Sequence, residues 1–155
     1  LSLHDALPIS LPPYIAPERP TGPDAFRLIP GRMALHTQSS TTNNPLLAEL
    51  APTNRLWLHA DRAKKLGIAD GDWVDVLTPS GSVGRLRAKV TTGIHPEAAF
   101  MLHGFGHELP QETRAFGKGV ADEACMVGGL AREDPLGGGL ALQEHFVTVR
   151  RVEDA

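Results

Sequence analysis

Two segments of this 155-residue chain hold most of the side chains that could bind a polar ligand. The first runs from Pro30–Arg32 to His36–Asn44 and offers a guanidinium, an imidazole and a series of hydroxyl and carboxamide groups. Such groups hydrogen-bond phosphates and sugars. The second is His103–His107 (HGFGH), where two glycines would let backbone N–H groups approach a ligand closely. By composition, each segment could equally be an ordinary turn-rich loop.

Other motifs give no support for catalysis within the chain. The P-loop pattern fails, because Glu112 stands where the pattern needs glycine before Gly117-Lys118. His103 and His107 are four residues apart, but the glycines between them argue against a helical zinc pair. Cys125 is the single cysteine and has no adjacent base. We therefore expect no catalytic residue and no metal ligand in this chain.

Composition excludes two further classes of function. The net charge of -3 argues against a nucleic-acid-binding protein that uses a broad basic surface. The apolar runs are too short to cross a bilayer, so we expect no direct membrane insertion. Arg85, Arg87 and Lys89 alternate with Leu86, Ala88 and Val90, which predicts a solvated strand face rather than a phosphate site.

The apolar pattern predicts a mainly β domain of about six strands, with one or two short helices and long loops. Strands this short bury little as an open sheet, so a closed barrel is the expected architecture. The expected strands are Phe26–Ile29, Arg55–Leu58, Trp73–Thr78, the alternating segment that ends near Val90, Ala98–Leu102 and Phe146–Val152; the expected helices are Pro45–Leu50 and Ala60–Leu66.

The chain divides into three parts. Residues 1–10 are typical of a translated sequencing adapter, so we exclude them from the fold and expect a truncated gene; the alternative is an extended tail. Residues 11–24 contain five prolines and predict an extended linker. Residues 25–155 then form the single folded domain, since a chain of this length has little room for two.

The folded part resembles the C-terminal, molybdopterin-dinucleotide-binding domain of DMSO-reductase-family molybdenum oxidoreductases. The likeness is nearest to the polysulfide, thiosulfate and arsenate reductase branch. Four segments carry it in the same order: GRMALHTQSSTTNN (Gly31–Asn44), LWLHADRAKKLGIADGDWVDVLTPSGSV (Leu56–Val83), HGFGH (His103–His107) and DPLGGGLALQEHFVTV (Asp134–Val149). The resemblance implies a double-psi β-barrel.

The resemblance also implies which residues bind the cofactor, bis-molybdopterin guanine dinucleotide with molybdenum or tungsten. They are Gly31, Arg32, His36, Thr37, Gln38, Thr42, Asn43, His103, Gly104, Phe105, Gly106, Asp122, Glu123, Gln143 and Glu144. Family members commonly carry an asparagine at the Asp122-Glu123 stretch, and this chain has acids there, so that contact differs here.

By this resemblance the chain is one domain of an oxidoreductase catalytic subunit. The ligand to the metal and any iron–sulfur cluster would belong to the N-terminal part, so the chain by itself should be inactive. Its partners would be the rest of that subunit and an iron–sulfur electron-transfer subunit, and the full enzyme would be periplasmic. Two alternatives remain open: a free-standing molybdopterin-binding subunit, and a cofactor-free double-psi barrel that binds a peptide or protein.

Overall fold

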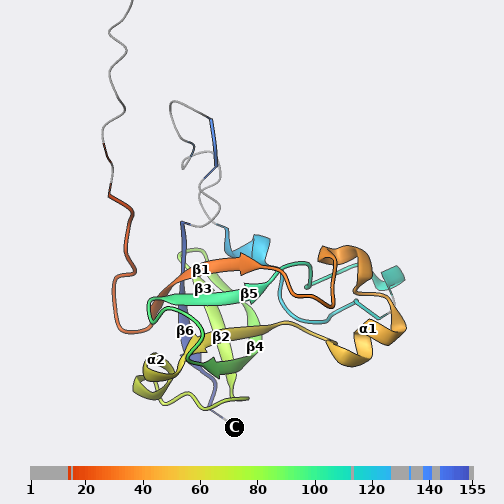
Figure 1. The fold of residues 1–155 in the computed structure, drawn as a ribbon, viewed down its shortest axis with the longest axis horizontal. Helices are drawn as coiled ribbons and strands as arrows, with labels where there is room; N and C mark the ends of the chain where they lie inside the picture. The colour runs from red at the N-terminus through yellow and green to blue at the C-terminus, as the bar shows by residue number, and fades with distance from the viewer. Residues whose placement is uncertain are drawn as a thin grey trace, which may run out of the picture.

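The chain folds as a closed barrel with loops that project from one end (Figure 1). The computed structural model describes residues 14, 16–112, 114–126, 133, 138–140 and 144–153. The expected adapter-like segment, residues 1–10, lies outside the described residues, as does Gln143.

Six strands follow one another around the barrel in the order β1-β5-β2-β4-β3-β6, and β6 closes onto β1. Their bounds are β1 Ala25–Gly31, β2 Arg55–His59, β3 Trp73–Thr78, β4 Gly81–Thr91, β5 Ala98–Leu102 and β6 His145–Arg151. The pairs β1–β5 and β2–β4 are parallel, and the other four pairs are antiparallel. The double-psi β-barrel expected from the sequence is confirmed.

The barrel interior is filled by the apolar half of each alternating strand. Its fully buried side chains are Phe26, Leu28, Leu56, Leu58, Val74, Val76, Leu86, Ala88, Ala99, Met101, Val147 and Val149. Residues between them face outward, as the period of two requires. The basic residues of β4 are on this outer face: Arg85 pairs with Asp75 at 2.8 Å, and Arg87 lies over the Trp73 ring. The predicted solvated face is confirmed.

Short helices occupy the connections. The α-helices are α1 Pro45–Leu50 and α2 Ala60–Lys65, and the 3-10 turns are η2 Gln38–Thr41, η3 Pro110–Glu112 and η4 Asp122–Cys125. Asn44 caps α1 by accepting from the backbone N–H groups of Leu46 and Leu47. None of the described helices is long and apolar enough to span a membrane.

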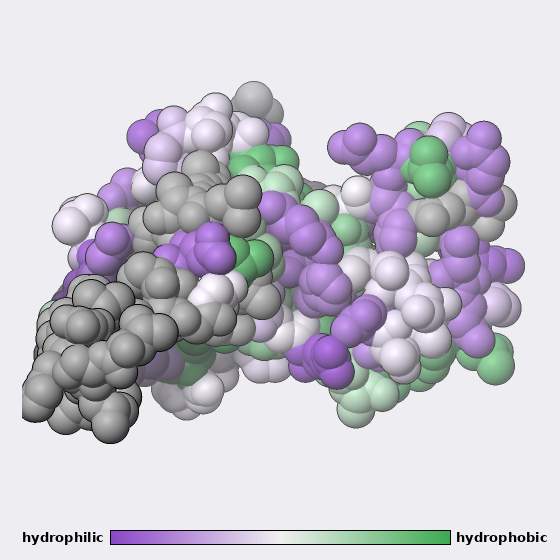
Figure 2. All heavy atoms as spheres, turned by 90° about the horizontal axis from the view of Figure 1, so that it is seen from above, coloured by the Kyte–Doolittle hydropathy of each residue, from purple (hydrophilic) through white to green (hydrophobic). Residues whose placement is uncertain are grey.

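The loops that carry η2, α1 and η3 extend away from one end of the barrel (Figure 1). Seen from above, they form a lobe that is separated from the barrel by a notch (Figure 2). Both polar segments identified in the sequence belong to this region: Gly31–Asn44 follows β1, and His103–His107 follows β5. Since β1 and β5 are adjacent and parallel, both segments leave the barrel at the same end.

Candidate functional site

The two polar segments begin side by side, because β1 and β5 end in register at Gly31 and Leu102. The backbone N–H of His103 donates to the carbonyl of Gly31 at 2.9 Å. A Cβ on Gly31 would lie 2.1 Å from the Phe100 ring, so a larger residue would have to displace that ring. The start of the first segment is therefore fixed against the start of the second.

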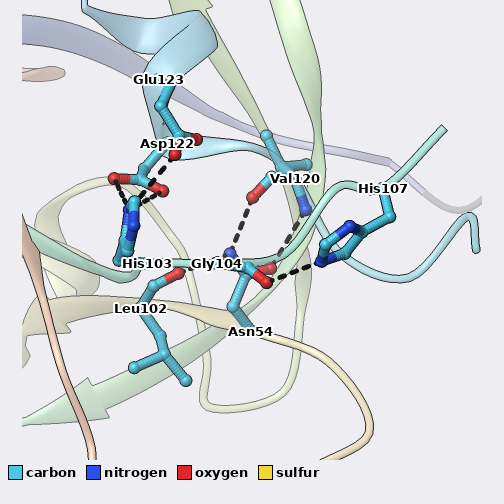
Figure 3. Close-up of polar contacts among 8 residues, drawn as sticks. All are labelled: Asn54, Leu102, His103, Gly104, His107, Val120, Asp122 and Glu123. Atoms are coloured by element: carbon cyan, nitrogen blue, oxygen red, sulfur yellow. Dashed lines mark hydrogen bonds and ion pairs between the residues drawn. The ribbon is translucent and has the colours of Figure 1, made fainter. Parts of the chain in front are cut away.

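Asn54 joins a third loop, the one that carries Val120, to this end of the barrel. Its side-chain N–H groups donate to the carbonyls of Leu102 (3.0 Å) and Val120 (2.8 Å), and its Oδ1 accepts from the Val120 N–H at 3.0 Å (Figure 3). The side chain is 1% exposed. Two carbonyls facing Nδ2 and one N–H facing Oδ1 define the orientation of the amide. Sequence reasoning did not single out this residue.

His36 shapes the first loop from within. It is 4% exposed, and its ring meets the Phe105 ring edge-on with 5.5 Å between centroids. Nε2 donates to the carbonyl of Ala51 at 2.9 Å, which leaves Nδ1 as an acceptor for the Thr41 hydroxyl at 3.2 Å. The same hydroxyl accepts from the Thr37 N–H. Both ring nitrogens of His36 are therefore engaged inside the chain.

Thr42 connects the first loop to the second polar segment, and Asn43 connects it to the loop that carries Arg114 and Ala115. The Thr42 hydroxyl donates to the Ser39 carbonyl at 2.8 Å and lies 3.3 Å from Nε2 of His107. Oδ1 of Asn43 accepts from the backbone N–H groups of Arg114 and Ala115 at 3.0 and 2.9 Å. The contacts with His107 and Arg114 join residues 65 and 71 positions apart, so they hold the lobe together.

Gly104 and Gly106 bring the loops into backbone contact. A Cβ on Gly104 would lie 2.5 Å from the Gln38 carbonyl carbon, and one on Gly106 would lie 2.2 Å from the Ala121 nitrogen. Both residues have positive φ angles, +93° and +81°. The sequence-based role for these glycines was ligand approach, whereas the contacts observed are with neighbouring loops.

His103 is the centre of a polar cluster on the other side of the second segment. Its Nδ1 lies 3.0 Å from each carboxylate oxygen of Asp122 and 3.4 Å from Oε1 of Glu123. Figure 3 shows the His103 ring pointing toward these two acids, while His107 points toward Gly104. The Asp122 side chain is fully buried, that of His103 is 30% exposed and that of Glu123 is 58% exposed.

These acids influence the nearby thiol. Cys125 is buried at the end of η4. Burial, followed by the negative charges of Asp122 and Glu123, raises the pKa of its thiol to about 12. The thiol is therefore protonated at neutral pH and unreactive.

Several of the expected binding residues remain accessible. Arg32, Thr37 and Gln38 are exposed, and Gln38 has a positive φ of 51° at the start of η2. Arg32 also lines a groove of about 560 Å³ whose wall includes Arg55, Lys89 and the Trp57 and Phe100 rings. Asp70 also lines the groove, so its three cations leave it with a net positive charge, although the chain as a whole is acidic.

The expected site residues thus fall into distinct groups. The structure brings together Gly31, His103, Asp122 and Glu123 on one side, and Gln38, Thr42, Gly104 and His107 on the other. Glu144, at the entry to β6, forms an ion pair with Arg27, which also lies over the Phe146 ring. That pair is on the outside of the barrel wall, where β1 meets β6.

Known proteins are similar to this chain in sequence or in fold. A family model described as Molydopterin dinucleotide binding domain matches residues 26–142. The thiosulfate reductase molybdopterin-containing subunit PhsA of Salmonella typhimurium is 36% identical over 92 residues, which are 59% of this chain and 12% of that protein. Acetylene hydratase from Pelobacter acetylenicus has the same fold, with a TM-score of 0.67 at 20% identity. That match covers 82% of this chain and 18% of the hydratase. The chain thus spans only a small part of either relative.

Proposed function

Since the chain belongs to the molydopterin dinucleotide-binding domain family, as its segments predicted, we propose that it covers one side of a molybdopterin guanine dinucleotide. The observation that carries this proposal is the arrangement at the loop end of the barrel. Buried contacts there fix three loops in place, yet Arg32, Thr37 and Gln38 stay exposed and His103 stays partly exposed. A preorganised set of exposed donors is what a large polar ligand requires.

The charges divide the proposed site into two ends. A pyrophosphate is favoured beside Arg32, which has no ion-pair partner in the described part of the chain, and beside the hydroxyl and amide groups of Thr37 and Gln38. Asp122 and Glu123 would repel a phosphate, so the His103 end suits the uncharged pterin ring system. His36, Thr42 and Asn43 would support this arrangement indirectly, since their polar atoms already contact other parts of the loop end.

When bound, the metal and its dithiolene ligands would supply the electron- or atom-transfer chemistry, and the protein would orient the cofactor. We further propose that the chain is part of a catalytic subunit similar to thiosulfate or polysulfide reductases. In that enzyme the metal ligand would come from another part of the subunit, an iron–sulfur subunit would deliver electrons, and the compartment would be the periplasm. The metal in that enzyme would be molybdenum or tungsten.

The binding proposal is tested by titrating the isotope-labelled 155-residue chain, without oxygen, with molybdopterin guanine dinucleotide released from a donor enzyme. Amide signals of Arg32, Thr37, Gln38 and His103 should shift, while those of the outer sheet face around Asp75 and Arg85 should not. An Arg32→Ala variant should bind more weakly, and an Arg85→Ala variant should bind as well as the parent chain.

Shifts confined to the outer face, or equal effects of the two arginine substitutions, would contradict the proposed site. The catalytic-subunit proposal has a separate test: the coding DNA is read upstream of codon 11. A continuous open frame with cysteines spaced for an iron–sulfur cluster is expected. A start codon next to residue 11 would favour the free-standing subunit instead.

A further inference from the structure

The contact between His103 and Asp122 determines which nitrogen of the imidazole carries hydrogen. An ionised carboxylate only accepts hydrogen bonds, and both oxygens of Asp122 lie 3.0 Å from Nδ1. Nδ1 is therefore the N–H of the ring, and in the neutral imidazole Nε2 carries the lone pair. Without such a partner, neither nitrogen would have a fixed role.

The position of the ring is fixed as well as its tautomer. The backbone N–H of His103 is bonded to Gly31, and the preceding carbonyl, that of Leu102, accepts from Asn54. Asp122 comes from η4, whose entry is held by the bonds between Val120 and Asn54. The ring is thus held by its backbone on one side and by a buried acid on the other.

Asp122 depends on this pairing in turn. Its side chain is fully buried, and in the described part of the chain His103 is the only group that donates a hydrogen bond to it. A buried carboxylate without a donor is strongly unfavourable. The imidazole is the more exposed member of the pair, and its Nδ1 is occupied by Asp122, so Nε2 is the ring nitrogen left for a ligand.

We propose that Asp122 is a positioning residue, which fixes His103 in the Nδ1–H tautomer so that Nε2 accepts a hydrogen bond from the cofactor. This inference rests on the proposed function and deepens it, since it assigns an indirect role to a buried acid of the proposed site. The partner of Nε2 would be an N–H donor, which the pterin ring system offers and a phosphate does not. An asparagine side chain carries its own donor and does not impose this tautomer.

A competing possibility uses the same atoms. Nδ1 of His103 and carboxylate oxygens of Asp122 and Glu123 lie within 4.8 Å of one another, as the ligands of a divalent cation would. The observed geometry favours the hydrogen-bonded pair, since Nδ1 is equidistant from both Asp122 oxygens. A metal site would need the opposite tautomer, with the lone pair on Nδ1. The two possibilities therefore differ in a measurable property.

The experiment records the imidazole nitrogen signals of the chelator-treated, isotope-labelled 155-residue chain at a pH where histidine is neutral. His103 should be almost entirely in the Nδ1–H form. In Asp122→Asn the ratio of Nδ1–H to Nε2–H should fall about tenfold or more, which is the change expected for losing a hydrogen bond to a charged group. Asp75→Asn, an acid-to-amide change on the outer sheet face, should leave the ratio unchanged.

Titration with molybdopterin guanine dinucleotide completes the test. The Nε2 signal of His103 should shift on binding, and Asp122→Asn should weaken binding about tenfold relative to Asp75→Asn. A parent chain with mostly Nε2–H at His103 would overturn the positioning role, even if Asp122→Asn did not fold. Stoichiometric displacement of the Nδ1 signal by added zinc would also overturn it, in favour of a metal site. A correct tautomer with no effect of the cofactor at any residue would instead count against the proposed function.

Discussion

Replacing Asn54 by alanine should strongly destabilise the loop end of the domain without straining the backbone. The substitution removes three hydrogen bonds, of 3.0, 2.8 and 3.0 Å, and leaves the carbonyls of Leu102 and Val120 and the N–H of Val120 without that partner. Because the side chain is 1% exposed, water cannot easily replace it. Each bond contributes about 1 kcal/mol net, and an unsatisfied buried group costs about 1–3 kcal/mol.

The expected loss in the free energy of unfolding is therefore about 3–5 kcal/mol, a large share of the 5–15 kcal/mol typical of a domain. For a chain of this size that corresponds to a fall in Tm of roughly 10 °C. The measurement is urea and thermal unfolding of the 155-residue chain, followed by circular dichroism. Asn54→Asp should be as damaging, since it retains the acceptor for Val120 but turns a carboxylate toward two carbonyls.

The matched control is Asn43→Ala, which also removes an amide that joins two loops. Oδ1 of Asn43 accepts from two backbone N–H groups, but the side chain is exposed and water can take its place. Its loss should cost about 0.5–1 kcal/mol. If both alanine variants lost the same small amount, burial of the Asn54 amide would not be what holds these loops together.

Three further changes test separate parts of the structure. Cys125 should resist thiol reagents in the folded chain at pH 8. Because its folded pKa of about 12 exceeds the 9.0 of an exposed thiol, the stability that the protonated thiol contributes is complete below pH 9 and is lost as pH rises toward 12. Relative to Cys125→Ala, the parent chain should lose about 1.4 kcal/mol between pH 8 and pH 10 in urea unfolding, and no difference would refute the shifted pKa. Gly106→Ala should lower the free energy of unfolding by about 3 kcal/mol or more, because a Cβ would meet the Ala121 nitrogen at 2.2 Å. Gly117 has a similar φ and open space around it, so Gly117→Ala should cost about 1–2 kcal/mol. Equal losses in the two variants would contradict the close packing at Gly106. Arg62 donates to three backbone carbonyls within residues 22–25. Arg62→Ala should therefore cost about 1 kcal/mol in thermal unfolding and expose residues 22–25 to proteolysis. Arg62→Lys should restore only part of the loss.

The strands were predictable because their information is local. β3 and β5 have the bounds that the sequence predicted, since apolar residues alternate within them and turn-forming residues flank them. α1 was also located to the residue, because Pro45 suits the first helical position; the Asn44 cap was seen only in the structure. β1 and β6 were found with ends shifted by one or two residues, within the usual uncertainty of boundaries.

The connections between loops were not predictable in this way. Asn54 follows Pro52 and Thr53 and has the appearance of a simple turn residue, while its partners Leu102 and Val120 are 48 and 66 positions away. Gly104 carried a signal, because glycine permits close approach, but the sequence could not say whether a ligand or the Gln38 backbone would come close. Burial of Asp122 against His103 had no local signal either, since acids in loops are usually exposed.

These long-range contacts account for several of the polar residues at the loop end. His36, Thr42, Asn43 and Asn54 have polar atoms bound to other loops, so they fix the shape of the lobe. An extended ligand that loses much conformational freedom on binding gains most from donors that are already in place, because less ordering then opposes association. A sequence that placed polar residues only at the ligand would leave those donors on mobile loops. Loop residues can therefore support binding without touching the ligand. Asp122, which we propose acts through His103, is one such residue, and the tautomer of His103 is the property that tests its role.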